Sequence, residues 1–372
     1  MDAAADFLMV GAVAFLTVLL ITPVVAWFAR RIGAVVAPRE RDVHKVATPT
    51  MGGLAIFAGI LAAIGAGSFL SSFDELFALT NEPEAVVLAS TLIVALGVVD
   101  DTRGVRAPAK LAGQILAVGL LVIFGLALRW VWIPGNPGTT LALSPDLQAI
   151  FTIGLIVAMM NAVNLVDGLD GLAAGIVTIA AGALFCYTQL DQFVGQAPST
   201  GPLLLVALVG ACLGFLVHNF NPASIFMGDT GAMLLGLLLG SAGVSAVGSS
   251  YLPPGRGTFA ALSIPVLVPV FVLAIPFVDT VVTIVRRLLS GQAVFSPDKR
   301  HLHHRLLEIG HSQRRAVLIM YYWSALLAFA AVGVGLLDMP VLLTVLGSGI
   351  VLAVVATLGF RISRRLADVR AR

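Results

Sequence analysis

The residues best suited to chemistry are acids that stand at the ends of long apolar stretches. Asp100 and Asp101 close one stretch in GVVDDTRGV, and Asp229 opens another in FMGDTG. Asp167 and Asp170 follow a third in NAVNLVDGLDGL. Clustered carboxylates repel one another unless a cation offsets them, and oxygen donors without cysteine suit Mg²⁺, with Mn²⁺ as the alternative ion. These acids therefore predict a phosphate-handling site, and the plainer alternative is a set of helix caps and solvated loop residues.

A polar strip leads toward the same region. Asn161, Asn164 and Asp167 are spaced three residues apart, so on a helix they lie along one side. We expect this strip to line a cavity, because polar groups that face lipid are costly. Lys110 and Gln114 stand one helical turn apart in another apolar stretch, where Lys110 either serves the site or pairs with neighbouring acids.

A basic segment, FSPDKRHLHHRLLEIG, supplies the opposite charge. Its Ser-Pro pair predicts a helix start, which places His301 and His304 three residues apart on one face. With Arg300 beside them, they form a cationic patch that suits a diphosphate. His303 points elsewhere on such a helix, so zinc binding by the histidines is the weaker alternative.

Near the start of the chain, HKVATPTMGGLAIF offers Lys45 as another basic candidate for the site. The adjacent Gly52 and Gly53 favour a different interpretation. Glycine pairs in membrane helices more often indicate close packing than contact with a ligand. We therefore expect a neighbouring segment to approach closely at this pair.

The elements that must position these residues are membrane helices. Of the 372 residues 59% are hydrophobic and 11% are charged, and the mean hydropathy is +1.00, which excludes a soluble enzyme and a disordered chain. A formal net charge of +2 leaves no strongly basic domain, so nucleic acid is not an expected partner. We predict an all-α integral membrane protein in which residues 1–372 form a single polytopic domain. About eleven apolar stretches serve as transmembrane helices, at residues 5–29, 50–70, 85–99, 109–128, 147–164, 170–189, 201–218, 230–250, 260–285, 316–337 and 339–360.

The positive-inside rule orients these helices. Between the stretches, 20 of the 22 Lys and Arg residues fall on one side, and only Arg129 and Arg256 fall on the other. With eleven crossings, this asymmetry places the N-terminus outside and the C-terminus in the cytoplasm. The predicted site then lies in cytoplasmic loops at residues 30–49, 100–109, 164–170, 218–229 and 286–315.

Five motifs together resemble the polyprenyl-phosphate N-acetylhexosamine-1-phosphate transferase family. They are ATPTMGG, the Asp100–Asp101 pair, NAVNLVDGLDGL, NPASIFMGDTG and HLHH, in the family's order. The resemblance implies a Mg²⁺-dependent, multi-pass enzyme of the bacterial plasma membrane with its active site on the cytoplasmic face. Such an enzyme transfers a sugar-1-phosphate from a UDP-sugar to a polyprenyl phosphate and releases UMP. Its partners are these two substrates and the membrane, and a homodimer is the open alternative to a monomer.

The resemblance also implies roles for individual residues. Asp229 matches the principal metal ligand, with Asp101 sharing the metal. The residues that match the catalytic group are Asp100, Asp101, Asp167 and Lys110. The residues that match substrate-binding positions are Lys45 and Asp170 for uracil, Phe226 for stacking on uracil, Asn164 and Asn219 for the nucleotide cleft, and Arg300, His301, His303 and His304 for the diphosphate and the sugar.

Two questions about the reaction remain: the route by which the phosphate is transferred, and the identity of the sugar donor. A phosphate monoester is largely dianionic at neutral pH, because its second pKa is near 6, which favours direct attack by the lipid phosphate over a covalent aspartyl phosphate. Leu302 interrupts the histidine run, which favours the WecA and TagO branch and its donor UDP-N-acetylglucosamine over the MraY branch and its phospho-N-acetylmuramoyl-pentapeptide. A secondary transporter is the remote alternative. It is disfavoured because the acids gather at one face and no repeat is evident.

Overall fold

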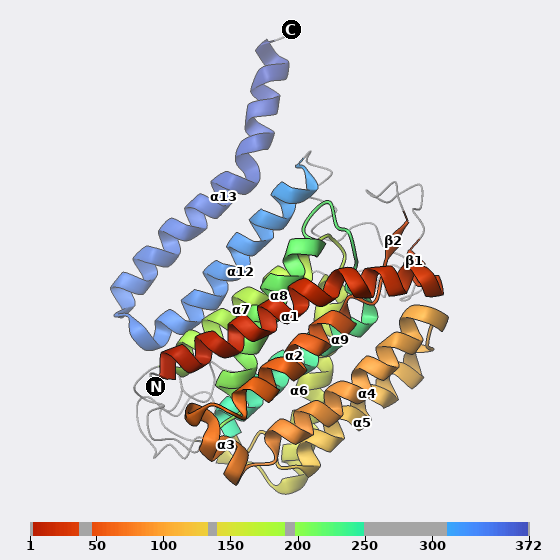
Figure 1. Cartoon of the computed structure of the whole chain (residues 1–372). Helices are drawn as coiled ribbons and strands as arrows, with labels where there is room; N and C mark the ends of the chain where they lie inside the picture. Colours follow the sequence, from red (N-terminus) through yellow and green to blue (C-terminus); the bar gives the residue numbers. More distant parts are fainter. Residues whose placement is uncertain (1–2, 37–46, 133–139, 190–197, 249–310, 371–372) are drawn as a thin grey trace.

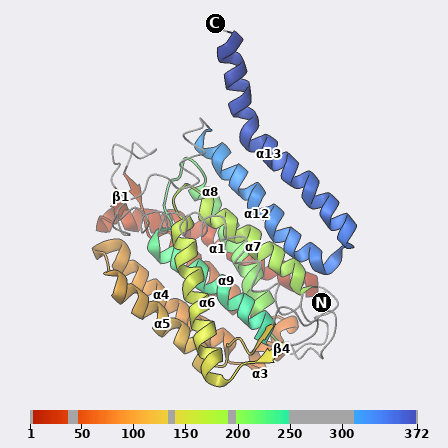
Figure 2. The same cartoon turned by 180° about the vertical axis from the view of Figure 1, so that it is seen from behind.

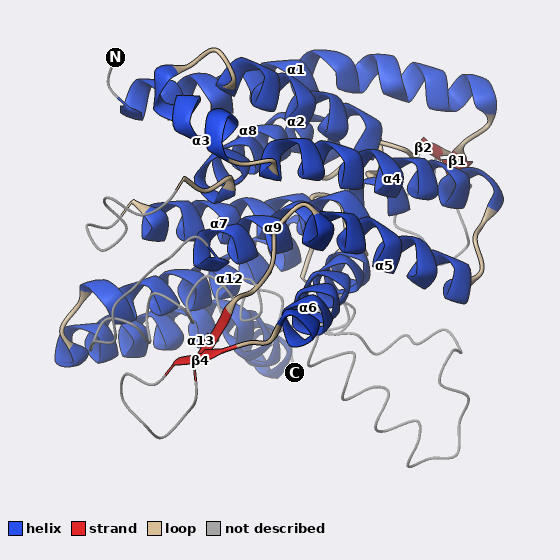
Figure 3. Cartoon of the chain, turned by 90° about the horizontal axis from the view of Figure 1, so that it is seen from below, coloured by secondary structure: helices blue, strands red, loops and turns tan. Residues whose placement is uncertain are grey.

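The computed structural model describes residues 3–36, 47–132, 140–189, 198–248 and 311–370, which form a bundle of long helices (Figure 1). Almost all of this part of the chain is helical (Figure 3). The longer helices are α1 (Ala3–Ile32), α2 (Gly53–Gly67), α4 (Glu82–Arg103), α5 (Ala107–Ile123), α6 (Pro145–Val166), α7 (Leu172–Thr188), α8 (Gly201–Asn219), α9 (Gly228–Gly248), α12 (Gln313–Leu336) and α13 (Met339–Arg370). The shorter elements are η1 (Ser71–Phe73), α3 (Asp74–Leu79), and two antiparallel strand pairs, β1 (Val35–Val36) with β2 (Thr48–Pro49) and β3 (Trp130–Trp132) with β4 (Thr140–Ala142).

The mostly helical prediction is confirmed, with the two short strand pairs as an addition. Ten of the eleven apolar stretches coincide with helices, and the stretch at 260–285 lies outside the described residues. By length and composition, six described helices can cross a membrane, or seven if α2 and the η1–α3 segment, bent by 93°, count as one span. The total of eleven crossings therefore stays a prediction.

Helix α9 occupies the centre of the bundle (Figures 1 and 2) and contacts α2, α4, α6, α7 and α8. A helix that is apolar on every side requires burial on every side. Small residues allow the neighbouring helices to come close. A Cβ on Gly236 would lie 2.4 Å from the Cα of Met160 in α6, and a Cβ on Gly97 in α4 would lie 2.4 Å from the Cα of Thr230. This packing fixes the start of α9 against α4.

The predicted loop at 100–109 needs correction. Helix α4 continues to Arg103, so Asp100 and Asp101 lie in its last turn rather than in a loop. The helix stops at Gly104, whose positive φ of 73° is a value that glycine adopts without strain. The two carboxylates are therefore held on a helix, which restricts their positions more than a loop would.

The predicted loops at 164–170 and 218–229 are also shorter than expected. Helix α6 continues past Asn164, and α9 begins before Asp229. Asn164, Asn219 and Asp229 thus stand in the terminal turns of helices. Asp167, Asp170 and Phe226 lie in the segments between helices.

Hydrogen bonds at the two ends of α1 show at which end of the bundle the chain begins. Asp6, near the start of α1, accepts a 2.6 Å hydrogen bond from the Ser72 hydroxyl at the far end of the α2–η1 segment. The other end of α1 leads to Ala34, whose carbonyl accepts a hydrogen bond from Thr50 N–H just before α2. The N-terminus therefore lies at the end of the bundle away from α9's first turn. At its C-terminal end, α13 extends past the rest of the bundle (Figures 1 and 2).

Candidate active site

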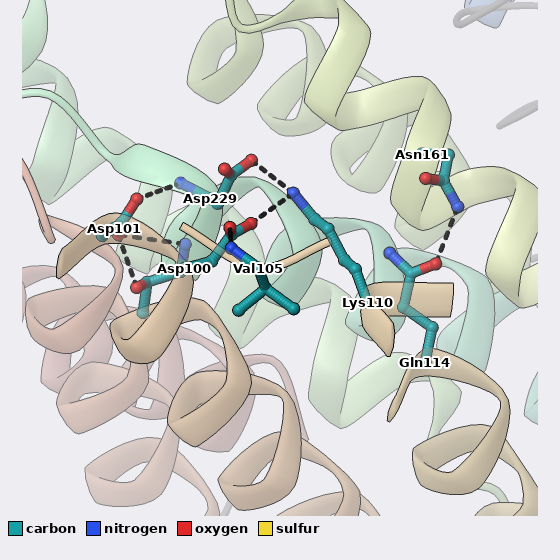
Figure 4. A network of polar contacts seen from close by, with 8 residues as sticks. Asp100, Asp101, Val105, Lys110, Gln114, Asn161 and Asp229 are labelled. Carbon is teal, nitrogen blue, oxygen red and sulfur yellow. Dashed lines mark hydrogen bonds and ion pairs between the residues drawn. The ribbon is translucent and has the colours of Figure 1, made fainter. Parts of the chain in front are cut away.

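Three helix ends meet at a cluster of charged side chains (Figure 4). The Nζ of Lys110, in the first turn of α5, lies 2.7 Å from Oδ2 of Asp100 and 2.9 Å from Oδ1 of Asp229. The other oxygen of Asp100 accepts a 2.7 Å hydrogen bond from the N–H of Val105. The Asp229 side chain is 32% exposed, whereas that of Asp100 is 8% exposed. The structure thus brings together three residues that the sequence assigned to one site.

Asp101 supports the start of α9 from a neighbouring helix. Its Oδ1 accepts a 2.8 Å hydrogen bond from Asp229 N–H, and its Oδ2 accepts bonds of 3.3 Å from Thr230 N–H and 2.6 Å from the Thr230 hydroxyl. These are the contacts of an N-cap, supplied here across the α4–α9 packing. A carboxylate at this position is also favoured by the helix dipole. Asp229 therefore does not cap its own helix, and its side chain is left for the site.

The segment that contains ATPTMGG pairs with the segment that precedes α9. Gly52 N–H and Gly53 N–H donate 3.0 Å hydrogen bonds to the carbonyls of Phe226 and Met227, and Phe226 N–H donates one of 2.8 Å to Pro49. A Cβ on Gly53 would lie 2.2 Å from Gly231 N. The close-packing interpretation of the glycine pair is therefore confirmed, and the pairing fixes the backbone of the half-buried Phe226.

We expect Gly53→Ala to lower stability, because the added methyl group meets backbone that cannot move without shifting α9. The cost of such overpacking is about 1–3 kcal/mol. Thermal unfolding in detergent checks this, with Gly65→Ala as the matched control in the same helix, since no atom lies within 4 Å of a Cβ there. An equal midpoint for the two variants would contradict the packing argument.

Asp167 adds a further carboxyl group to the cluster, directly after the last turn of α6. Desolvation by the surrounding protein is the main cause that raises the pKa of Asp167 to about 7, and the negative charges of Asp229, Asp101 and Asp170 raise it further. Acids at the end of α4, at the start of α9 and in the α6–α7 turn therefore form one group of neighbouring negative charges. Such a cluster favours the binding of a cation.

The donor set fits a hard divalent cation. Within the described ranges, no three His, Cys, Asp or Glu side chains form a complete metal site. Mg²⁺ does not need one, because it usually binds one or two carboxylates and completes its shell with water and substrate phosphates. The relatively exposed Asp229, together with Asp167, would hold such an ion. Asp101 is less suited, because both its oxygens already accept hydrogen bonds from α9.

Asp170 connects the α6–α7 turn to the segment between α8 and α9. Its Oδ2 accepts hydrogen bonds of 2.9 Å from the Asn221 amide and 3.0 Å from Ala223 N–H. The Asn221 amide also donates a 2.7 Å bond to Gln313 at the start of α12. Asp170 is only 4% exposed, so its contacts with the protein hold the edge of the site in place.

Asn219 also links the α6–α7 turn to the segment between α8 and α9, by hydrogen bonds to backbone groups of both. Its amide nitrogen donates a 2.9 Å hydrogen bond to the Ile225 carbonyl, and its carbonyl accepts a 3.0 Å bond from Gly171 N–H. The side chain is 2% exposed. In this structure Asn219 therefore helps to fix the backbone conformation around the site.

Of the remaining candidates, one lies within the described residues and five lie outside them. Asn164 is half-buried on α6, on the helix turn that precedes Asp167. Asn221 and Gln313 were missed by the sequence analysis, because their only signal is a position just after the end of α8 and at the start of α12. Residues of the basic segment and of the first loop lie outside the described residues, namely Lys45, Arg300, His301, His303 and His304.

Comparison with known proteins identifies similar chains. The profile of glycosyl transferase family 4 matches residues 84–247. Decaprenyl-phosphate N-acetylglucosaminephosphotransferase of Mycolicibacterium smegmatis is 44% identical over 358 residues, which is 95% of this chain and 88% of the relative. The probable undecaprenyl-phosphate N-acetylglucosaminyl 1-phosphate transferase of Bacillus subtilis is 34% identical over 86% of this chain and 82% of its own. Phospho-N-acetylmuramoyl-pentapeptide-transferase of Desulforudis audaxviator is 33% identical over 88% of this chain and 96% of its own.

Proposed function

Because this chain belongs to glycosyl transferase family 4, we propose that it transfers N-acetylglucosamine-1-phosphate from UDP-N-acetylglucosamine to a polyprenyl phosphate. The products are UMP and polyprenyl-diphospho-N-acetylglucosamine, the first membrane intermediate of a cell-wall or surface polysaccharide. The observation that carries this function is the 44% identity, over 95% of the chain, to a decaprenyl-phosphate N-acetylglucosaminephosphotransferase. The acceptor is decaprenyl or undecaprenyl phosphate, the two lipids named for the relatives.

In the reaction, an oxygen of the lipid phosphate attacks the phosphorus that carries the sugar. The bond from that phosphorus to the bridging oxygen breaks, and UMP leaves with the electron pair. Two anions must approach each other, so the site has to supply positive charge. Lys110 supplies part of it, and Mg²⁺ held by Asp229 and Asp167 would neutralise the diphosphate.

The position of Asp100 supports direct attack by the lipid phosphate. One of its oxygens is paired with Lys110 and the other accepts a hydrogen bond from Val105 N–H. A carboxylate engaged at both oxygens is a weak nucleophile, but through its contact with Lys110 it can help to orient the lipid phosphate. We therefore assign Asp100 to orientation of the acceptor, and a covalent aspartyl phosphate is the disfavoured alternative.

The protein is a multi-pass membrane protein, and we place its site on the cytoplasmic side of the bacterial plasma membrane. The support is the one-sided distribution of Lys and Arg together with the water-soluble donor. The N-terminus is then outside. Lys45 and Phe226 are assigned to the uridine, and the diphosphate and sugar are assigned to the basic segment with Arg300, His301, His303 and His304.

A competition between donors tests this function. Purified protein in detergent receives polyprenyl phosphate with either UDP-N-acetylglucosamine or UDP-N-acetylmuramoyl-pentapeptide, and UMP release is measured. We expect release with the first donor that depends on the lipid and needs no sealed vesicle. Preference for the pentapeptide donor would move the chain to the other branch, and the absence of UMP with both donors would remove the enzyme assignment.

A further inference from the structure

The Gln114 side chain is a buried polar group with an unused donor. It is 1% exposed, and its Oε1 accepts a 2.9 Å hydrogen bond from the Asn161 amide of α6. Its Nε2 has no hydrogen-bond partner among the described residues. Burial of an unpaired donor is unfavourable, so such a group in a native protein calls for an explanation. A ligand that brings an acceptor atom would provide one.

Gln114 lies directly next to the charged cluster. It follows Lys110 by four residues on α5, so the two side chains share one face of the helix. Figure 4 shows the Gln114 amide nitrogen turned away from Asn161, toward the side on which Lys110 lies. An ammonium group and an amide donor on adjacent turns present two kinds of donor to one ligand. The ligand they suit is an oxyanion such as a phosphate.

Asn161 fixes this orientation of Gln114. Its amide nitrogen also donates a 2.8 Å hydrogen bond to the Val157 carbonyl, one turn back along α6. Asn161 stands on an exposed stripe of α6 that is otherwise apolar, between Ala158 and Leu165. A polar residue in such a stripe marks a place where a polar ligand group meets an apolar one.

The depth of Gln114 indicates which phosphate binds there. Four helical residues carry it about 6 Å farther along α5 than Lys110, away from the helix end where the water-soluble donor arrives. The phosphate that reaches this depth with an apolar chain attached is that of the lipid acceptor. We propose that Gln114, oriented by Asn161, binds an oxygen of the polyprenyl phosphate and so aligns the acceptor beside Lys110. This inference rests on the proposed function, because that function supplies the lipid phosphate.

The test measures binding without turnover, as the shift in unfolding temperature of the full chain in detergent. The probes are polyprenyl phosphate, the matching polyprenol without phosphate, and UMP. We expect Gln114→Met to lose the difference between the phosphate and the alcohol, with the UMP shift unchanged. Gln114→Glu adds a negative charge and should also lose the difference between the phosphate and the alcohol. In a separate rate measurement, this variant should raise KM for the lipid about tenfold and leave KM for UDP-N-acetylglucosamine unchanged.

Ser90→Ala is the matched control, because Ser90 is another buried polar residue without a hydrogen-bond partner in the described structure, on α4 away from the cluster. It should keep all three responses. Retention of the phosphate-specific shift in both Gln114 variants would overturn the proposal. Equal loss of the lipid and UMP shifts would also overturn it, because Gln114 would then support the fold. If the parent protein responds to the lipid phosphate but releases no UMP with either donor, the proposed function fails and the subsite stands.

Discussion

Asp229→Asn should lower kcat at least about a hundredfold while the protein stays folded. The substitution keeps the size of the side chain but removes its negative charge, so the residue can no longer pair with Lys110 or attract a cation to the diphosphate. Because the backbone of α9 is capped by Asp101, the start of the helix should stay in place. Initial rates of UMP release and the unfolding temperature measure the two effects separately.

The matched control is Glu75→Gln, the same change of a carboxylate to an amide at an exposed position of α3. It should leave the rate unchanged. Excess EDTA should abolish the parent's activity, and addition of Mg²⁺ should restore it. Full activity of Asp229→Asn, or undiminished activity of the parent in EDTA, would contradict the assignment of Asp229 to the cation.

Lys110→Gln should also lower kcat at least about a hundredfold, and it should weaken the site more broadly. Removal of the ammonium group leaves Asp100 and Asp229 close together without the charge that bridges them. The resulting repulsion should displace both acids, and the reacting phosphates lose a cation. Stability should fall as well, because loss of one partner leaves the other charges uncompensated.

Lys110→Arg distinguishes charge from geometry. The guanidinium keeps the positive charge but is planar and bulkier than an ammonium group. We therefore expect the unfolding temperature to recover while kcat recovers only in part. A Lys110→Gln variant with the parent's rate would mean that the bridge in the resting protein is unrelated to catalysis.

The sequence located the charged cluster because its residues stand at the polar ends of apolar stretches. Asp100, Lys110 and Asp229 belong to three different helices. The one-sided distribution of Lys and Arg in the loops was enough to place the ends of these helices at the same side of the membrane. Their pairwise contacts could not be predicted in the same way. Lys110 was open to a structural or a catalytic role, and the structure shows it paired with two acids of the site.

The role of Asp101 was beyond sequence reasoning. Its hydrogen bonds join residues about 130 positions apart, and they depend on how closely α4 packs against α9. That packing requires Gly97 opposite Thr230, a match that no local pattern reveals. The buried contacts of Asp170 and Asn219 depend on tertiary structure for the same reason.

Helix boundaries were predicted less well than helix positions. The apolar pattern ends before Asp100, but hydrogen bonding continues to Gly104, so the helix extends into a polar sequence. The glycine pair at Gly52 and Gly53 was interpreted correctly, because close backbone approach is the commonest reason for such pairs in membrane proteins.

The central claim is that a phosphate moves together with the sugar, and a doubly labelled donor tests it most directly. UDP-N-acetylglucosamine carries ³²P in the phosphate next to the sugar and ³H in the uridine, and it is incubated with the purified protein and polyprenyl phosphate. Extraction into organic solvent then separates the lipid product from the nucleotide. The account predicts ³²P in the lipid fraction and ³H in UMP. Recovery of both labels together in UDP, with an unlabelled phosphate linking the sugar to the lipid, would contradict it.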